Sequence, residues 1–490
     1  MIDLSVNEQQ LEKTVEVARE RDIIIPTFEQ MKNPELIPGK VKEELKDIGL
    51  WDVHPRNLFR ITWQNEPVEE GGLYDGINYV ELPSDLTGVD ARIFCLVGKW
   101  FPTGAHKVGA TFGCLAPRLT TGQFDPVNEM AVWPSTGNYC RGGAYNSALL
   151  ACDSIAILPE EMSQERFEWL EKVAGETFTT PGGEANIKEI FDKCWELRED
   201  PEYSDRIVIF NQFEEFGNNL WHYEVTGGAM KDVLEAELED GQRLAATVLT
   251  SGSSGTLGSG ERMKDEFPGS KLAVGEALQC PTLLENGYGA HRIEGIGDKH
   301  VPWIHNVRST DAVVGIDDND CMDLVRFFNE PAGHDYLRNQ GVDSEVVDNL
   351  DLMGISSIAN VLGCIKYAKK YELSENDALV TVWTDSMQLY GSRLEEMREA
   401  NPGYEQTDAE QDFERSVLGQ DTEFVLDLKH EEKRRIHNLK YFTWIEQQGL
   451  NADDLDEQWD RWPEYWDEIH QQSDDVDELI KEFNDRVGLL

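Results

Sequence analysis

The sequence predicts an α/β fold in which helices cover parallel sheets. From about residue 91, short apolar runs alternate with helical stretches, and small polar or Gly/Ser-rich loops follow several of the runs. The expected strands cover residues 93–97, 131–133, 154–158, 206–210 and 244–249. Repeated strand–helix units build parallel sheets, and ligands bind such sheets at the carboxyl ends of the strands.

The helical stretches lie between these strands and at both ends of the chain. One begins after Lys107, two more cover residues 144–150 and 165–173, and another follows the strand at 206–210. We expect four parts, listed from the N-terminus: an extension over 1–90 partly packed on the larger lobe, a smaller lobe over 91–240, a larger lobe over 241–400, and an acidic helical extension over 401–490. In the last part, Trp459, Trp462 and Trp466 have the spacing of one helix face, which favours docking on the core or on a second subunit over a ligand site.

The composition excludes several classes of partner. Lys and Arg number 44 against 94 Asp and Glu, which gives a net charge of −50 spread along the 490 residues. A field of this sign repels nucleic acid and anionic membranes. Because 40% of the residues are hydrophobic, the acidic excess indicates adaptation to a salty cytosol rather than disorder.

The sequence shows no targeting segment and no metal-binding pattern. Residues 1–5 lack the basic and apolar parts of a secretory signal, and no apolar run reaches the ~18 residues of a membrane helix, so we expect a cytoplasmic protein. The eight cysteines form no Cys-x-x-Cys pair, and His430 and His437 stand seven residues apart rather than four. These spacings predict neither a disulfide framework nor a metal site.

Lys107 is the main candidate for covalent chemistry. A lone lysine is usually a solvated surface charge, but one that forms a Schiff base must be partly desolvated. Lys107 stands between Gly104-Ala105 and Gly109-Ala110, small residues that we expect to let a flat ring approach. Two further segments supply what a lysine-bound aldehyde needs, and the three together suggest pyridoxal 5′-phosphate as cofactor.

The first of these segments follows the expected strand at 244–249 and contains Gly252, Ser253, Ser254, Gly255 and Thr256. We expect its backbone N–H groups, its hydroxyls and the positive end of the next helix to bind a phosphate. A flexible connector is the alternative for such a loop taken alone. The segment 252–256 lacks the Gly-Lys-Ser sequence of a nucleotide P-loop, so we do not expect it to bind ATP.

The second segment is the loop Ser135-Thr136-Gly137-Asn138-Tyr139, for which an ordinary Asn/Gly turn is the alternative. Asn138 can donate to the 3′ oxygen of the ring, while Ser135 and Thr136 can hold a substrate carboxylate. Farther on, Ser356 opens a helical stretch and can face the pyridine nitrogen. A neutral hydroxyl does not keep that nitrogen protonated, which favours β-elimination over transamination.

On these residues, the chain resembles the cysteine synthase and cystathionine β-synthase family of fold-type II, tryptophan synthase β-like pyridoxal phosphate enzymes, over roughly residues 91–395. Other similar stretches are Met162–Arg166 with Thr180–Gly182, Asn211–Phe213 with His222-Tyr223 and Thr226-Gly227, and Glu294–Gly297 ahead of Val301-Pro302. The resemblance implies two doubly wound lobes with the cofactor between them, and we expect a homodimer. It also implies roles for individual residues: Lys107 as the Schiff-base lysine, Asn138 as the 3′-oxygen partner, Gly252 to Thr256 as the phosphate loop, Ser356 as the pyridine partner, and Ser135, Thr136, Gly137, Tyr139 and Gln212 as substrate contacts.

The departures from the family pattern bear on substrate choice. The stretch ending in Lys107 is closer to tryptophan synthase β, but Pro134 stands where that enzyme has its catalytic carboxylate, so indole chemistry is disfavoured. Tyr139-Cys140-Arg141 replaces a small Thr-Gly and predicts a bulkier pocket wall, with Arg141 facing substrate, lying at the surface or forming an ion pair in the core. Ser254 occupies a usual glycine position, which leaves the loop's backbone conformation open.

The leading hypothesis is β-elimination from a serine- or cysteine-type amino acid to an α-aminoacrylate, followed by addition of a nucleophile such as sulfide. The alternative is a lyase that releases the aminoacrylate, such as a dehydratase, desulfhydrase or ammonia-lyase. A non-catalytic protein that binds the cofactor is a third hypothesis, against which the retention of Lys107 and both loops argues.

The net charge generates a first prediction. Because the charges repel one another where they are unscreened, the melting temperature should rise steeply between dilute buffer and molar salt. Thermal unfolding at increasing KCl concentration measures this. A melting temperature that does not respond to salt would contradict the interpretation as a salt-adapted protein.

Overall fold

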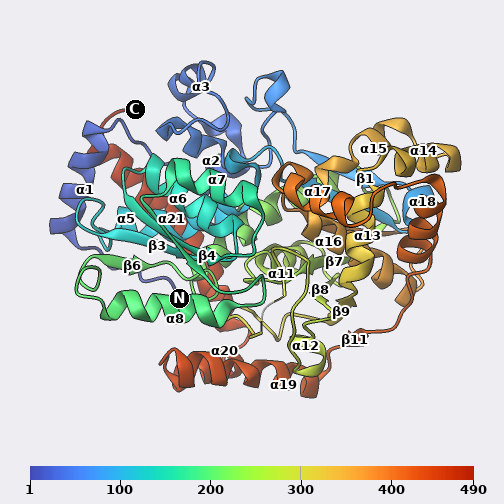
Figure 1. The fold of residues 1–490 in the computed structure, drawn as a ribbon. Coiled ribbons are helices and arrows are strands. Elements are labelled where there is room, and N and C mark those ends of the chain that lie inside the picture. The colour runs from blue at the N-terminus through green and yellow to red at the C-terminus, as the bar shows by residue number, and fades with distance from the viewer. Residues whose placement is uncertain (298) are drawn as a thin grey trace.

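The computed structural model describes residues 1–297 and 299–490, and within them two sheets form the framework of the fold (Figure 1). The smaller sheet has four parallel strands, in the order β5 (Glu176–Thr180), β4 (Asp153–Pro159), β3 (Met130–Pro134) and β6 (Ile207–Ile209). The larger has seven, in the order β1 (Tyr79–Leu82), β2 (Arg92–Val97), β10 (Asp377–Trp383), β7 (Arg243–Thr250), β8 (Lys271–Ala277), β9 (Ala312–Ile316) and β11 (Val425–Asp427). Its inner five strands are parallel and its two edge strands antiparallel. The predicted α/β class with parallel sheets is confirmed.

Helices surround both sheets. The N-terminal ones are α1 (Glu8–Glu20), α2 (Phe28–Lys32), α3 (Gly39–Leu45) and α4 (Ser84–Thr87). The next six are α5 (Lys107–Thr120), α6 (Asn138–Leu149), α7 (Gln164–Val173), α8 (Ile187–Glu199), α9 (Phe216–Trp221) and α10 (Gly227–Glu237). Around the larger sheet lie α11 (Leu257–Glu266), α12 (Thr282–Glu285), α13 (Asp318–Phe327), α14 (Pro331–Gln340), α15 (Ser344–Asp348), α16 (Ile355–Lys370) and α17 (Gly391–Ala400). The last are α18 (Gln406–Phe413), α19 (His430–Lys440), α20 (Ala452–Asp460) and α21 (Glu464–Val487).

The smaller sheet is covered on both faces because its strands send alternate side chains to opposite sides. On β3, Trp133 packs in one apolar cluster with Ala144 of α6, whereas its neighbour Val132 packs in another with Ile190 of α8. Figure 1 shows α6 and α8 on opposite sides of this sheet. We call this sheet with helices α5 to α8 the smaller lobe.

The larger sheet, with the helices that pack on it, forms what we call the larger lobe. Helix α16 packs along β7 to β10, and α11 packs against β7 and β8. Strand β2 lies within residues 91–240, the range predicted for the smaller lobe, but it pairs with β10 in the larger sheet. The chain therefore crosses between the lobes in the segment from β2 to Lys107, and the division into four parts otherwise remains a prediction.

The C-terminal residues run from the larger lobe to the smaller one. Helix α18 packs on α13 and α14, β11 pairs with β9, and α21 contacts α5, α9 and α1. The prediction that three tryptophans share one helix face is wrong, because α20 ends at Asp460 and Pro463 precedes α21. Trp459 and Trp466 are nevertheless buried, and Trp466 packs edge-on against Phe216.

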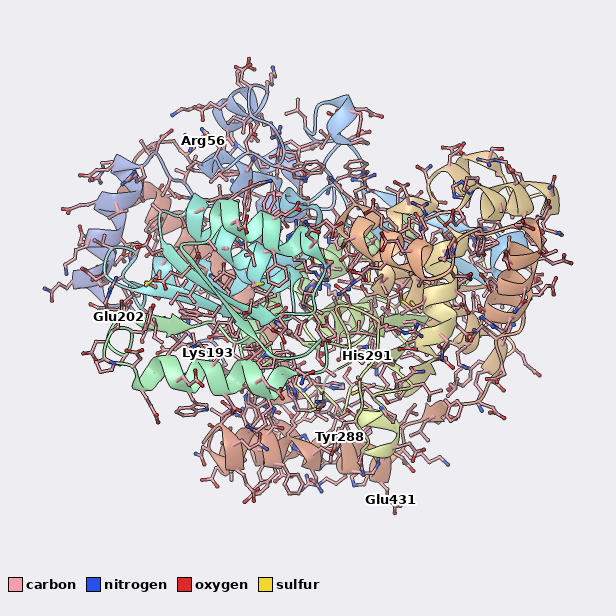
Figure 2. All side chains as sticks on the ribbon, viewed as in Figure 1. Arg56, Lys193, Glu202, Tyr288, His291 and Glu431 are labelled. Atoms are coloured by element: carbon pink, nitrogen blue, oxygen red, sulfur yellow. The ribbon has the colours of Figure 1, made fainter. Side chains whose placement is uncertain are left out.

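Acidic side chains lie at separate places on the outline of the molecule. Figure 2 shows side-chain oxygens around the entire outline, with Glu202 and Glu431 labelled at two places far apart. In the described part of the chain, no helix combines the length and the apolar character that a membrane crossing requires.

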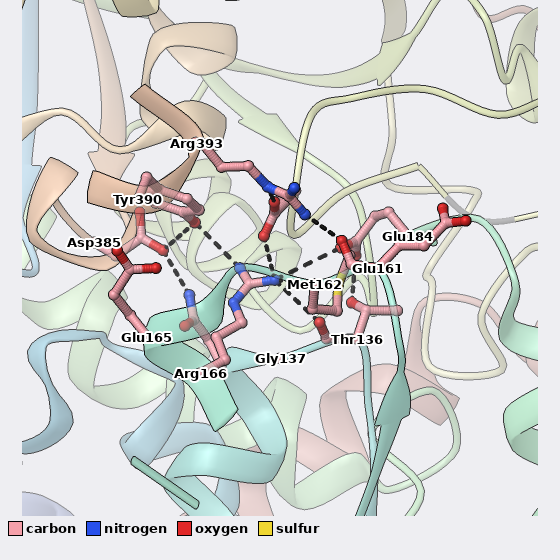
Figure 3. Close-up of polar contacts among 12 residues, drawn as sticks. Thr136, Gly137, Glu161, Met162, Glu165, Arg166, Glu184, Asp385, Tyr390 and Arg393 are labelled. Carbon is pink, nitrogen blue, oxygen red and sulfur yellow. Dashed lines mark hydrogen bonds and ion pairs between the residues drawn. The ribbon is translucent and has the colours of Figure 1, made fainter. Parts of the chain in front are cut away.

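A buried ion network joins the two lobes (Figure 3). Its centre is Arg166 of α7, which is fully buried and whose Nη1 lies 2.7 Å from Glu294 Oε2 and 4.0 Å from Glu184 Oε2. Nη1 also donates to the backbone oxygen of Thr136 (3.0 Å), and Nη2 donates to the hydroxyl of Tyr390 (3.2 Å). Although burial disfavours its charge, Glu294 and the other acidic groups raise the pKa of Arg166. The guanidinium thus ties α7 and the loop after β3 to segments that follow β8 and β10.

Arg166 should therefore dominate the stability of the lobe interface. Replacing it (Arg166→Met) removes the cation between two buried carboxylates and leaves Glu294 with Arg393 as its remaining ion-pair partner, so the free energy of unfolding should fall by about 3 kcal/mol. Chemical denaturation measures the loss, and Arg461→Met, which removes an exposed arginine from a surface ion pair, is the matched control. Equal stability of the two variants would show that the network does not hold the lobes together.

Candidate active site

A pocket opens where the carboxyl ends of strands from both sheets face each other. Its lining residues come from the loops after β2, β3, β6, β7, β8 and β10, from the residues after β5 and from the start of α16. They are His106, Lys107, Ser135, Thr136, Asn138, Tyr139, Glu184, Gln212, Phe213, Thr250, Gly252, Ser253, Ser254, Thr256, Gly295, Ile296, Ser356 and Thr384. All of the site residues predicted from the sequence are in this set except Gly137 and Gly255. The position agrees with the rule that ligands of open α/β sheets bind beyond the carboxyl ends of the strands.

The two exceptions lie in the predicted loops but face away from the pocket. A Cβ on Gly137 would lie 2.5 Å from Arg166 Cζ, and a Cβ on Gly255 would lie 2.0 Å from Asn218 Oδ1. Both glycines therefore allow close packing behind the pocket.

Lys107 is the first residue of α5, and its side chain is aimed at the loop after β7. Its Nζ donates to Ser253 Oγ (2.8 Å) and to Gln212 Oε1 (3.3 Å), so three predicted residues meet at one amine. The neighbouring His106 is buried, and burial together with the charge of Lys107 lowers the pKa of His106 to about 3. At neutral pH His106 is therefore uncharged.

The glycines on either side of Lys107 were expected to let a flat ring approach, but they have other roles in the structure. Gly104 has a φ of +73° and lies in the turn before Lys107. A Cβ on Gly109 would lie 2.1 Å from Trp221 Cζ2, so this glycine lets α5 approach α9. Neither glycine lines the pocket, and the expectation that they make room for a ring is not supported.

The loop from Gly252 to Thr256 has the features of an anion site. It joins the end of β7 to the N-terminus of α11, and no chain acceptor binds the backbone N–H groups of residues 252–256 among the residues described. Ser254 has a φ of +64°, so it adopts the left-handed conformation for which a glycine is the usual residue. Its hydroxyl lies 2.8 Å from that of Ser251. Ser254 therefore adopts the left-handed backbone conformation although it has a side chain.

Asn138, the first residue of α6, is held by a carboxylate that the sequence analysis did not identify. Its Nδ2 donates to Asp385 Oδ2 (2.5 Å), and Tyr390 donates its hydroxyl to the same oxygen (2.7 Å). Burial raises the pKa of Asp385, while the hydrogen bond from Tyr390 and the positive charge of Arg166 oppose this shift. Asp385 and its neighbour Thr384 directly follow the apolar strand β10, so the rule applied to the other loops would have found them.

Ser356, near the N-terminus of α16, faces the pocket as predicted. Its hydroxyl lies 2.8 Å from that of Thr384, and Gly295 lies across from it, since a Cβ on Gly295 would lie 3.7 Å from Ser356 Oγ. Both neighbours are uncharged. The pocket therefore presents a neutral hydroxyl pair at this point.

The loop predicted to hold a substrate carboxylate is partly engaged within the chain. Ser135 Oγ accepts from the N–H of Gly137 (2.9 Å), and the Thr136 hydroxyl donates to Glu184, which the sequence analysis also missed. Glu184 lines both this pocket and a second cavity of about 590 Å³, whose apolar wall includes Met162 and Met322. The pocket therefore adjoins additional space at the lobe interface.

Arg141 does not line the pocket. It is buried, its Nη2 donates to the backbone oxygen of Thr103 (3.0 Å), and its guanidinium lies over the ring of Trp169. Burial and the nearby Arg166 lower the pKa of Arg141 to about 10. Arg141 is thus a core residue, but within the described residues its acceptor is a backbone oxygen and not the carboxylate of a predicted ion pair.

Known proteins resemble this chain in sequence and in fold, although no family model matches it. A cysteine synthase of Staphylococcus aureus is 27% identical over 290 residues, which are 59% of this chain and 84% of that protein. A probable cysteine synthase of Bacillus subtilis is 27% identical over 301 residues, 61% of this chain and 88% of that protein. Cystathionine β-synthase of Saccharomyces cerevisiae is 25% identical over 324 residues, 63% of this chain and 59% of that protein.

Solved structures show the same fold. Cysteine synthase from Entamoeba histolytica superposes with a TM-score of 0.56 at 20% identity, over 69% of this chain and 93% of its own. The O-acetylserine dependent cystathionine β-synthase from Helicobacter pylori superposes with a TM-score of 0.53 at 21% identity, over 64% of this chain and 94% of its own. Sequence and fold together confirm the predicted resemblance of this chain to the cysteine synthase and cystathionine β-synthase family.

Proposed function

We propose that the protein is a pyridoxal phosphate-dependent enzyme that eliminates the β-substituent of a serine- or cysteine-type amino acid and adds a nucleophile in its place. One observation carries the proposal: the amine of Lys107 lies 2.8 Å from Ser253, within the loop whose N–H groups are available to an anion. An amine beside an anion site is the arrangement that an aldehyde bearing a phosphate requires. The cysteine synthases and cystathionine β-synthase named above support the same reaction class.

The residues of the pocket fit this cofactor. The N–H groups of residues 252–256 and the N-terminus of α11 would bind the phosphate, and Lys107 would bind the aldehyde carbon. The amide of Asn138 would donate to the ring oxygen, and Ser356 would face the ring nitrogen. When bound, pyridoxal phosphate withdraws electrons from the α-carbon of an amino acid, so that a β-substituent can leave.

The chain's own groups would move the proton and orient the substrate. Lys107 Nζ, held by Ser253 and Gln212, is positioned to take a proton from the substrate α-carbon. Because Ser356 and Thr384 are uncharged, they do not hold a proton on the ring nitrogen, which favours elimination over transamination. The substrate carboxylate would bind in the loop of Ser135 and Thr136.

The second cavity supports a nucleophile larger than sulfide. It has a volume of about 590 Å³ and meets the catalytic pocket at Glu184. A lyase that releases its product to water would use the same residues but would not need this space. We therefore place replacement before simple elimination.

We also propose that the enzyme works as a homodimer in a salty cytoplasm. The net charge of −50 supports the salty cytoplasm, because such a charge keeps a protein soluble where salt screens it. The homodimer rests on the resemblance to the family alone. Sedimentation in molar KCl would measure the oligomeric state.

The reaction type is tested by product analysis. With O-acetylserine as substrate, added sulfide should convert the product from pyruvate and ammonia to cysteine. With cysteine as substrate, an added small thiol should likewise give the corresponding S-substituted cysteine and release sulfide. Lys107→Ala should lose both turnover and the visible absorbance of lysine-bound cofactor. Pyruvate as the main product at every thiol concentration would favour the lyase, and a Lys107→Ala protein with reducible, covalently held cofactor would contradict the assignment of this lysine.

The role of Ser356 is tested by changing the charge opposite the ring nitrogen. Ser356→Asp should keep that nitrogen protonated, make the ring a stronger electron sink, change the absorbance and slow β-elimination by at least about tenfold. Ser356→Ala should be milder because only a hydrogen bond is lost. Ser357→Ala is the matched control, since the Ser357 hydroxyl lies 3.4 Å from the backbone oxygen of Asp385. Unchanged elimination and absorbance in Ser356→Asp would show that Ser356 does not face the nitrogen.

A further inference from the structure

We propose that Asp385 is a positioning residue, which fixes the carboxamide of Asn138 so that its N–H side serves the ring oxygen of the cofactor. The inference rests on the proposed function and assigns a role to a residue that lies outside the predicted site. It depends on the hydrogen bonds and burial of two side chains.

The contact between the two side chains is short and shielded from water. Asn138 Nδ2 donates to Asp385 Oδ2 at 2.5 Å, and Asp385 is fully buried. Asn138 Oδ1 is also buried and has no hydrogen-bond partner in the described part of the chain. An amide oxygen left in that state is unfavourable, so the orientation must be imposed by the bond on the nitrogen side.

Asp385 imposes this orientation because its Oδ2, which accepts from both Asn138 and Tyr390, is an oxygen without a hydrogen to donate. If the carboxamide of Asn138 turned over, its oxygen would face Asp385 Oδ2, and two acceptors would repel each other. The nitrogen has two hydrogens, so one can bind Asp385 while the other remains for a second acceptor. A neutral partner at position 385 would not enforce this choice.

Asp385 is itself held in place from two sides. Tyr390 donates its hydroxyl to Oδ2 (2.7 Å) and accepts from Arg166 Nη2 (3.2 Å). On the other side Asp385 packs against Gly354, where a Cβ would lie 1.9 Å from Oδ1. Gly354 directly precedes α16, the helix that carries Ser356. The carboxylate thus has one available position, and Asn138 adopts the orientation that suits it.

The segment of Asp385 also touches the other cofactor residues. Thr384 accepts a hydrogen bond from the backbone N–H of His106 (3.0 Å), next to Lys107, and its hydroxyl meets that of Ser356. The two residues after β10 therefore contact the segments of the lysine, the ring-oxygen partner and the ring-nitrogen partner. This placement explains why a carboxylate is found here rather than a residue that only fills space.

The test measures cofactor binding by the full-length apoenzyme. Asp385→Asn keeps the shape of the side chain but can donate to a turned-over Asn138, so pyridoxal phosphate should bind about tenfold more weakly. The pH at which the visible band changes should move, and kcat should fall more than KM changes. Tyr390→Phe, which keeps the carboxylate but frees it to rotate, should show a smaller loss in the same direction.

The matched control is Asp477→Asn. Asp477 is another buried aspartate, on α21, and it accepts from the N–H groups of Phe28 (2.6 Å) and Glu29 (3.0 Å) outside the pocket. The Asp477→Asn substitution should lower the melting temperature without changing cofactor affinity or absorbance. A purely structural role for Asp385 would give the same pattern and would overturn the inference.

A double-mutant cycle shows whether Asp385 acts through Asn138. Once Asn138→Ala has removed the carboxamide, adding Asp385→Asn should weaken cofactor binding little further. Additive losses would overturn the inference, as would wild-type affinity in Asp385→Asn. If Asp385→Asn does not fold, Tyr390→Phe decides, and its equality with wild type would overturn the inference. Failure of the wild-type apoenzyme to bind pyridoxal phosphate would instead contradict the proposed function.

Discussion

The relative placement of the two lobes depends on the buried guanidinium of Arg166. It reaches acceptors in segments that are far apart in the sequence, among them Thr136 and Glu294, and a planar group with five N–H donors can do so without changing its rotamer. Lysine has one point charge and could satisfy fewer of these acceptors. Because the pocket is built from loops of both sheets, its geometry follows from this contact.

The pocket itself is organised by the end of one inner strand. Strand β10 lies between β2 and β7, so the residues after it face the loop that leads from β2 to Lys107 and the loop after β7. Parallel strands bring such ends to one edge of a sheet, and the smaller lobe brings its own strand ends opposite. Residues from six separate loops can therefore meet although each belongs to a short local segment.

Local patterns in the sequence predicted strands β2, β3, β4, β6 and β7, the fold class and the main pocket residues, because each depends on neighbouring residues, whereas the other strands of the structure were not predicted. The segments of Lys107, Asn138 and Ser253 each follow an apolar strand, and Ser356 opens a helix. What the sequence did not reveal depends on distant contacts. The roles of Gly109 and Gly137 are set by Trp221 and Arg166, and the pairing of β2 with β10 joins residues nearly 300 positions apart.

Asp385 and Glu184 escaped the sequence analysis for a different reason. Asp385 follows an apolar run that was not among the expected strands, so the rule for strand ends was not applied to it. Glu184 follows no such run, and in a chain with 94 acidic residues a carboxylate in a loop is ordinarily a solvated surface group. Burial is a property of the assembled lobes. The wrong prediction for Trp459 and Trp466 has another cause, because Pro463 between them was a visible signal that the helix breaks there.

Strand β11 affects how strongly the larger sheet can pair with strands of other molecules and aggregate. It pairs antiparallel with β9, so the residues Val425–Asp427 occupy hydrogen-bonding groups at what would otherwise be an open edge of the larger sheet. An open edge is a template on which strands of other molecules can add. Salt screens the repulsion between charged surfaces, but it does not weaken short-range backbone hydrogen bonds to the same extent. Surface charge therefore prevents such addition less well at high salt. Because β11 itself has only three residues, the outer edge that it leaves is too short to template an added strand, and this holds in concentrated salt, where repulsion between molecules is screened.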